Sequence, residues 1–110
     1  MREVKAIIRP QRLDAVIEAL RRIPALPGVT VSTVHAYRVG PAGGNLRSEG
    51  ELEADFTKLE IFAPESLVDE IVRAIAGAGH TGRAGDGLVL VIPVERLLRI
   101  RDADAAGGGN

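Results

Sequence analysis

Four short stretches of the chain have the apolar pattern of a β-strand. In residues 3–8 the apolar positions become continuous toward the end, which indicates a strand that is buried there on both faces. Residues 29–37 alternate and are rich in β-branched side chains, which favour strands, and residues 88–92 are wholly apolar. Residues 56–63 form the remaining stretch, in which Leu59 and Ile61 are expected to face inward and Lys58, Glu60 and Phe62 outward.

Two longer stretches repeat apolar residues with the spacing of one helical face. The first helix is expected to begin at Pro10, because proline is favoured in a first helical turn. The second is expected to begin at Pro64 and Glu65 and to end at Gly77 and Gly79. The apolar stripes are Leu13, Val16, Ile17 and Leu20 in the first helix, and Leu67, Val68, Ile71, Val72 and Ile75 in the second.

A long polar segment separates the second and third strands. Residues 39–55 have no apolar period and contain four glycines, one proline and four acidic residues, so we expect a long functional or mobile loop. The order of elements is then β-α-β-loop-β-α-β, which predicts an α+β, ferredoxin-like βαββαβ sandwich. We expect one domain over residues 1–102 and a mobile tail over 103–110. Because both faces of the strands carry apolar residues, we also expect an oligomer.

Composition and charge remove several classes of function. The net charge is −1, and the aromatic residues number only three, so a nucleic-acid-binding protein is not expected. The chain contains no cysteine, which excludes disulfides and thiolate metal sites. Because no apolar run approaches the roughly 20 residues that cross a bilayer, we expect no membrane insertion and a cytoplasmic location.

A glycine-rich segment lies between the second helix and the last strand. Residues 80–87 read H-T-G-R-A-G-D-G, and such a loop can direct several backbone N–H groups toward one anion. Residues 97–101 are expected to form a short strand, which would place Arg99 and Arg101 on one face. Together these features suggest a phosphate site. The alternative, a simple helix-to-strand turn followed by a solvated strand, stays open.

Three motifs in this order resemble the PII signalling proteins. They are V-K-A-I-I-R-P-Q-R-L-D-A-V at 4–16, T-G-R-A-G-D-G at 81–87 and R-L-L-R-I-R at 96–101. The resemblance implies a homotrimer that binds ATP or ADP in clefts between subunits. It also implies that residues 39–55 dock on a partner protein.

The same resemblance implies a set of nucleotide-binding residues. Arg99 and Arg101 would reach the phosphates from the neighbouring subunit, and Ile7 with residues 60–62 would lie near the adenine. For Arg38, phosphate contact and a salt bridge at the base of the loop are equal alternatives. The full set of expected ligands is Ile7, Thr30, Arg38, Arg47, Lys58, Glu60, Phe62, Gly85, Asp86, Gly87, Arg99 and Arg101.

The sequence departs from the nitrogen-sensing PII proteins at several positions. Leu88 stands where those proteins have a lysine after G-D-G, and A-Y-R-V-G at 36–40 replaces their G-F-G-R-Q, so a glutamine that helps to hold magnesium and 2-oxoglutarate is missing. The long loop contains no tyrosine and therefore cannot be uridylylated there. We accordingly expect ADP or AMP to bind at least as tightly as ATP.

The long loop itself resembles a different group. G-G-N-L-R-S-E-G at 43–50 is similar to a run in PII-like proteins that are tied to bicarbonate transport and carboxysomes, in which Arg47 would be a phosphate ligand. We therefore expect an adenine-nucleotide-binding regulator of bicarbonate transport, with a membrane transporter as partner and bicarbonate as a further effector. The alternative is a nitrogen-regulatory PII protein that senses ATP, ADP and 2-oxoglutarate.

An enzyme is the least supported class. The chain lacks the G-x-x-x-x-G-K-[ST] motif of nucleotide hydrolases, and its sequence shows no nucleophile–base pair. Asp86 is interpreted as a turn-forming residue rather than a catalytic acid. His35 and His80 lie far apart and are interpreted as surface residues, because a metal site needs three or four clustered ligands.

Overall fold

The computed structural model describes residues 1–37, 39 and 53–103. Its elements follow the expected order, with two helices, four strands and two short 3₁₀ turns in the described part. The elements are β1 (Arg2–Ile8), η1 (Pro10–Arg12), α1 (Leu13–Arg21), β2 (Thr30–Tyr37), β3 (Glu53–Ala63), α3 (Glu65–Gly79), β4 (Gly87–Pro93) and η2 (Ile100–Asp102).

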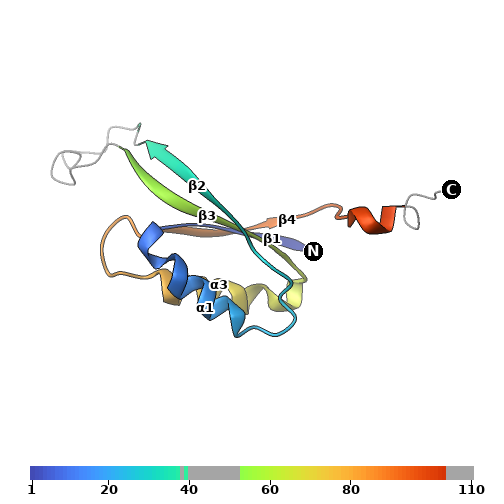
Figure 1. Ribbon diagram of the computed structural model, residues 1–110. Helices are drawn as coiled ribbons and strands as arrows, with labels where there is room; N and C mark the ends of the chain where they lie inside the picture. Colours follow the sequence, from blue (N-terminus) through green and yellow to red (C-terminus); the bar gives the residue numbers. More distant parts are fainter. Residues whose placement is uncertain (38, 40–52, 104–110) are drawn as a thin grey trace.

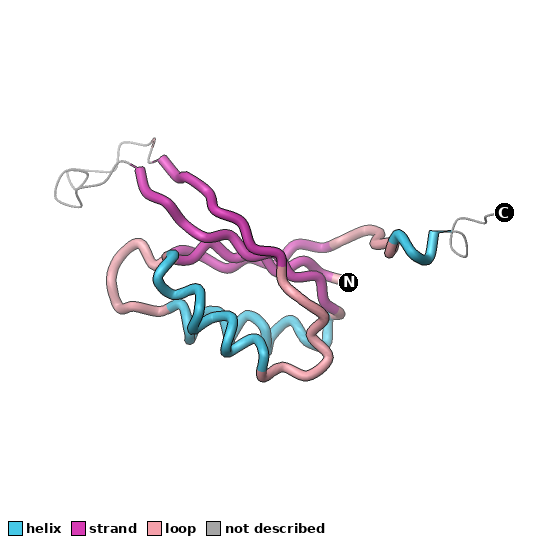
Figure 2. The backbone as a smooth tube through the Cα atoms, viewed as in Figure 1, coloured by secondary structure: helices cyan, strands magenta, loops and turns pink. Residues whose placement is uncertain are grey.

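The four strands form one antiparallel sheet in the order β2-β3-β1-β4. Both helices lie on the same side of this sheet (Figure 1), and Figure 2 shows the two layers from the same direction. At the centre of the sheet Val4 pairs with Ile61 on one side and with Val91 on the other. The α+β, ferredoxin-like fold predicted from the order of elements is therefore confirmed.

The core lies between the helices and the inner face of the sheet. The predicted helical stripes and the inward-facing strand residues are confirmed, since their central members are buried. The most completely buried large side chains are Leu59, Ile61, Ile71, Ile75, Val4 and Val16. They pack together because the apolar residues of the helices recur with the helical period, and those of the strands recur at every second position, so each set lies on one face.

The two helices are also joined at their neighbouring ends. Gly79 ends α3 against Ile8 and Val16, whose side-chain carbons would lie 3.6 and 3.8 Å from a Cβ at that position. Arg12 donates from Nε and Nη2 to the carbonyl of Ala78, at 2.9 and 2.7 Å. This fork satisfies one of the carbonyl groups that the end of a helix leaves without a partner.

The outer face of the sheet is not covered by the helices. Ile7 of β1 pairs with Lys58 of β3 and with Leu88 of β4, so the three side chains form one row on that face. Leu88 is 53% exposed and Phe62 is 42% exposed. The expectation that both sheet faces carry apolar residues is thus confirmed for the described part of the chain.

Several boundaries differ from the expected ones. Helix α1 begins at Leu13 rather than at Pro10, because residues Pro10–Arg12 form the 3₁₀ turn η1, and β1 and β4 extend one residue beyond the expected ends. Strand β2 begins at Thr30 rather than at residue 29 and is mostly exposed, because it is one of the two edge strands of the sheet. Strand β3 begins at Glu53, so the last three residues of the expected loop 39–55 belong to a strand. Residues 40–52 and the tail from 104 onward lie outside the described residues, and their expected mobility stays a prediction.

The expectation of a strand over residues 97–101 is wrong. This segment enters the 3₁₀ turn η2 and lies away from the two-layer body in Figure 1. A strand needs a neighbour for its backbone groups, and the described part of the protomer offers none there. Arg99 precedes η2 and Arg101 lies within it, so the two do not share a face as they would in a strand.

Two absences hold for the described residues. No helix among them is long and apolar enough to cross a bilayer. No group of three or more histidine, aspartate or glutamate side chains lies close enough to hold a metal ion in the part of the chain that the structure describes.

Candidate functional site

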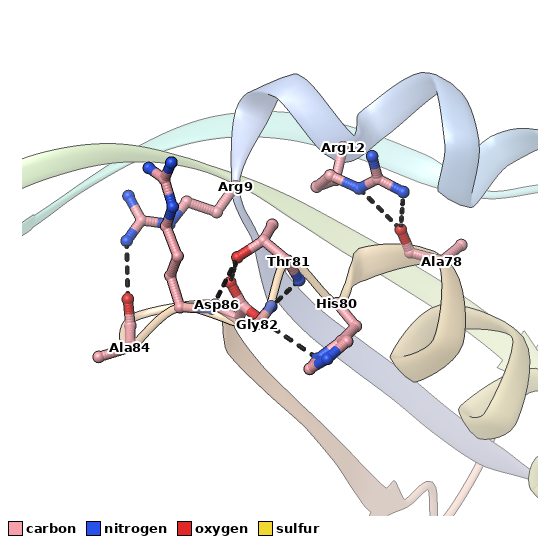
Figure 3. A network of polar contacts seen from close by, with 9 residues as sticks. Arg9, Arg12, Ala78, His80, Thr81, Gly82, Ala84 and Asp86 are labelled. Carbon is pink, nitrogen blue, oxygen red and sulfur yellow. Dashed lines mark hydrogen bonds and ion pairs between the residues drawn. The ribbon is translucent and has the colours of Figure 1, made fainter.

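The glycine loop, residues 80–87, is folded around the carboxylate of Asp86. Oδ2 accepts hydrogen bonds from the backbone N–H groups of Thr81, at 2.8 Å, and Gly82, at 3.3 Å, while Oδ1 accepts one from the Thr81 hydroxyl. Figure 3 shows these contacts within one turn of the chain. The loop thus directs two of its N–H groups toward one carboxylate, which belongs to an aspartate of the loop itself.

These contacts stabilise the charged form of Asp86. The Thr81 hydroxyl lowers the pKa of this carboxyl most, followed by the Thr81 N–H, the Gly82 N–H and nearby His80. His80 Nδ1 lies 3.6 Å from Oδ2. A carboxylate whose oxygens accept this many hydrogen bonds is a structural group and a poor proton donor at neutral pH. The interpretation of Asp86 as a turn-forming residue agrees with this geometry.

The three glycines of the loop allow it to close. Gly82, Gly85 and Gly87 have φ angles of 85°, 85° and 110°, which other residues rarely adopt. At Gly87 a Cβ would lie only 1.9 Å from the carbonyl oxygen of Ile7. The close approach that this glycine permits is therefore that of strand β1.

A hollow of about 290 Å³ lies beside the glycine loop, next to the end of α3 and the adjoining ends of β1 and β4. Its lining includes three of the residues expected from sequence, Ile7, Asp86 and Gly87, together with Leu88 and His80. Within the described residues the N–H groups of Gly85 and Asp86 have no hydrogen-bond partner. The hollow thus has mostly apolar walls and lies next to a loop with free N–H groups, and small-molecule sites commonly combine apolar walls with a few polar groups.

The remaining expected residues on the sheet are distributed along its outer face. Lys58 pairs with Ile7 at the end nearest the glycine loop, and Glu60 pairs with Thr30 of β2 two residues further along. Phe62 lies two residues beyond Glu60, so it stands roughly 13 Å along the strand from Lys58. The fold therefore places Lys58 near the loop and Phe62 toward the other end of the same face.

An acidic pair also lies on this face. Burial raises the pKa of Glu3, and a side-chain hydrogen bond with Glu60 raises it further, while the nearby lysines Lys5 and Lys58 oppose the shift. Glu3 Oε2 is buried and has no hydrogen-bond partner among the described residues. A carboxyl group in such surroundings holds its proton to higher pH than an exposed one.

Arg99 and Arg101 are not brought to the glycine loop within the protomer. Strand β4 pairs Gly87 with Ile8 and Pro93 with Arg2, so the C-terminal segment leaves from the opposite end of the sheet. Both arginines are exposed. Arg38 and Arg47, two further expected ligands, lie outside the described residues.

Comparison with known proteins identifies the family of the chain. The family model for nitrogen regulatory protein P-II matches residues 1–104. The chain belongs to the P-II family. It is 37% identical over 110 residues to the nitrogen regulatory protein P-II of Azospirillum brasilense, covering 97% of each protein.

Other P-II proteins are similar to the same extent. The nitrogen regulatory protein P-II of Haemophilus influenzae and the nitrogen regulatory protein P-II 1 of Escherichia coli are each 36% identical over 107 residues, which covers 94% of this chain and 95% of theirs. The suspected resemblance to PII signalling proteins is therefore confirmed. The names of these P-II relatives favour the nitrogen-regulatory alternative over bicarbonate transport, whose motif at 43–50 lies outside the described residues.

The sequence pattern does not single out Arg9, which this P-II chain places against the glycine loop. Its Nη2 donates to the carbonyl of Ala84 at 3.0 Å, and its Cζ lies 5.8 Å from the centre of the Phe56 ring. One signal could have found it. In a split βαβ arrangement the end of β1 lies beside the start of β4, so a residue just after β1 faces the loop that precedes β4.

Proposed function

We propose that this P-II-family protein is a regulator that binds an adenine nucleotide at the glycine loop and acts in nitrogen regulation. The observation that carries the proposal is the loop itself, which folds around Asp86 and borders a hollow lined by Ile7 and Gly87. Free N–H groups at Gly85 and Asp86 are suitable donors for a phosphate. No catalytic step is part of the proposal.

The complete site needs more than one copy of the chain. Gly87 and Pro93, at the two ends of β4, are separated by roughly 20 Å at the usual rise of a strand. Arg99 and Arg101 follow Pro93, so they would serve the glycine loop of a neighbouring subunit rather than their own. A homotrimer with its nucleotide in the clefts between subunits has this property, and it also covers the open face of each sheet.

The nucleotide preference is part of the proposal. Leu88 provides no charge beside the loop, and each unpaired charge of a further phosphate in a partly dry cleft is costly. ADP or AMP should therefore bind at least as tightly as ATP, and 2-oxoglutarate should add little. The partner, a transporter or another regulated protein, would be contacted through the segment 39–55.

Titration calorimetry with AMP, ADP and ATP tests the proposal. We expect ADP to bind, and we expect Arg101→Ala to weaken it about 10- to 100-fold, because a charge-assisted contact contributes about 1.5–3 kcal/mol. Arg73→Ala, which removes an equally exposed arginine from α3, is the matched control and should leave binding unchanged. Absence of ADP binding, or equal binding by the Arg101 variant, contradicts the proposed site.

A second titration addresses the preference alone. ATP with magnesium is added in the presence and absence of 2-oxoglutarate. If this combination binds much more tightly than ADP, the preference for fewer phosphates is wrong, and the protein senses the same ligands as the nitrogen-type members.

A further inference from the structure

Arg9 is placed to meet an anion at the glycine loop. A Cβ at Gly85 would lie 2.7 Å from Arg9 Nη2, so the guanidinium rests directly against the backbone of the loop. The same nitrogen donates to Ala84 O at 3.0 Å. Figure 3 shows Arg9 reaching over Ala84 from the end of β1.

Most of the hydrogen-bonding capacity of Arg9 is uncommitted. A guanidinium carries five N–H donors, and the structure gives Arg9 one acceptor, the carbonyl of Ala84. Among the described residues it has no carboxylate partner, whereas Arg2 pairs with Glu65 and Arg21 with Glu18. Arg12, which lies three residues further along the chain, already gives two nitrogens to Ala78. Arg83 of the loop itself is exposed.

The position of the guanidinium is also fixed from its other side. Its Cζ lies 5.8 Å from the centre of the Phe56 ring, within the range of a cation–π contact. Phe56 belongs to β3, which is part of the rigid sheet. An arginine held over a ring loses less freedom when it binds a ligand than one that is free in solvent.

The carboxylate of the loop already has other hydrogen-bond partners. The Asp86 carboxylate is engaged by Thr81, Gly82 and His80, so it does not use Arg9. Leu88, at the start of β4, contributes no charge. Arg9 is therefore a cation that the protomer itself holds beside free loop N–H groups.

We propose that Arg9 is a phosphate ligand of the glycine loop, which binds the second phosphate of a nucleotide and favours ADP over AMP. This inference rests on the proposed function, because it assigns an additional residue to the same site. The N–H groups of Gly85 and Asp86 and the free donors of Arg9 would then bind one anion from two directions.

The test compares AMP and ADP in the wild-type protein and in Arg9→Gln, which removes the charge. We expect ADP to bind about tenfold or more weakly to the variant, and AMP to lose distinctly less, because only ADP carries the second phosphate. Adenosine binding should not change. Phe56→Leu keeps the charge of Arg9 and removes the aromatic ring beside it. Arg73→Gln, on the outer surface of α3, is the matched control.

Two outcomes would overturn the assignment while leaving the proposed function intact. The first is that Arg9→Gln loses the same affinity for AMP and for ADP, which would mean that Arg9 only supports the loop. The second is that the variant loses no affinity for either nucleotide. If wild-type protein binds neither nucleotide, the proposed function and this inference both fail.

A measurement on the unmodified protein covers the case in which Arg9→Gln does not fold. The Arg9 side-chain N–H resonance, followed by nitrogen-edited NMR, should shift when ADP is added and not when adenosine is added. An identical response to both compounds excludes a direct phosphate contact.

Discussion

The glycine loop and the C-terminal segment contain the two expected groups of phosphate ligands, and they differ in how far one protomer completes them. The loop is closed by contacts within six residues, from Thr81 to Asp86. The C-terminal segment leaves the body and exposes Leu97 by 40%, Leu98 by 43% and Ile100 by 91%. The loop is therefore a local structure, whereas the segment has the composition of an element that packs on another surface.

This difference has an energetic side. Burying one leucine or isoleucine side chain contributes about 1.5–3 kcal/mol, which the exposed segment does not gain in the isolated protomer. The loop, by contrast, offsets the entropy lost on ordering its three glycines with hydrogen bonds to Asp86. Substitutions in the loop should therefore lower the stability of the single protomer. Substitutions in the C-terminal segment should instead weaken the association of subunits.

The largest expected effect is that of Gly87→Ala. A methyl group there would meet the Ile7 carbonyl oxygen, which is backbone and can move only if β1 and β4 separate. We expect a loss of at least about 2 kcal/mol in the free energy of unfolding, measured by chemical denaturation.

Gly77→Ala in α3 is the matched control for this change. Nothing lies within 4 Å of a Cβ at Gly77, and its φ is not positive. Alanine should stabilise the helix by about 0.5–1 kcal/mol. Equal effects of the two substitutions would contradict the role given to Gly87.

The next effect concerns association. Ile100→Ser removes the most exposed apolar side chain of η2, so it should leave the far-UV spectrum unchanged and weaken the oligomer about tenfold or more. Sedimentation velocity over a range of concentrations measures this. Val39→Ser, at a position 93% exposed at the start of the long loop, is the control and should not alter the mass distribution. If the wild-type protein is monomeric, the role in association that distinguishes the C-terminal segment from the loop is contradicted.

A smaller effect is expected from Asp86→Asn. The lowered pKa of Asp86 means that its stabilising contribution is complete above the ordinary value of 3.8 and is lost as pH falls through the lower folded-state value. At pH 7 the variant should unfold a few degrees earlier, because an amide presents one acceptor oxygen instead of two. Below pH 3.8 the stabilities of the two proteins should converge in thermal unfolding scans, and curves that stay parallel would contradict this role.

The smallest effect is expected at Glu3, whose pKa is shifted in the opposite direction. A folded state that holds this proton more tightly loses stability as pH rises from 4.5 through the raised value. Glu3→Gln should remove that part of the pH dependence and be slightly more stable than wild type at pH 7. Denaturation curves at pH 4.5 and 7 measure the difference, and an unchanged pH slope would show that Glu3 does not titrate in this range.

Local pattern was sufficient to predict most of the fold. The period of two in 56–63 and the helical stripe from Leu67 to Ile75 report burial directly, and the structure buries Leu59, Ile61, Ile71 and Ile75. The start of β3 could not be predicted in this way, because its pairing with β2 continues from Phe56 through Asp55 to Glu53, beyond the apolar pattern. The segment 97–101 has strand-like composition but no neighbouring strand, which a local pattern cannot reveal.

Some features of the candidate site could be predicted from the local sequence, and others depend on how the chain folds. The positive φ values of Gly82, Gly85 and Gly87 follow from the composition of the loop. The role of Asp86 as the acceptor at its centre depends on how the loop folds back. Arg9 required knowledge of which strand ends are neighbours, because 75 residues separate it from Ala84.

The order of the sheet also constrains when the protein can fold during its synthesis. β1 is made first, yet both of its neighbours in the sheet, β3 and β4, come from the second half of the chain. The first half, β1-α1-β2, contains no pair of adjacent strands. At about 5–20 residues per second, β1 must wait several seconds on the ribosome before Pro93 has been added. Such non-local pairing predicts slow folding and a nascent chain whose apolar strand β1 is open to chaperones until β4 has been synthesised.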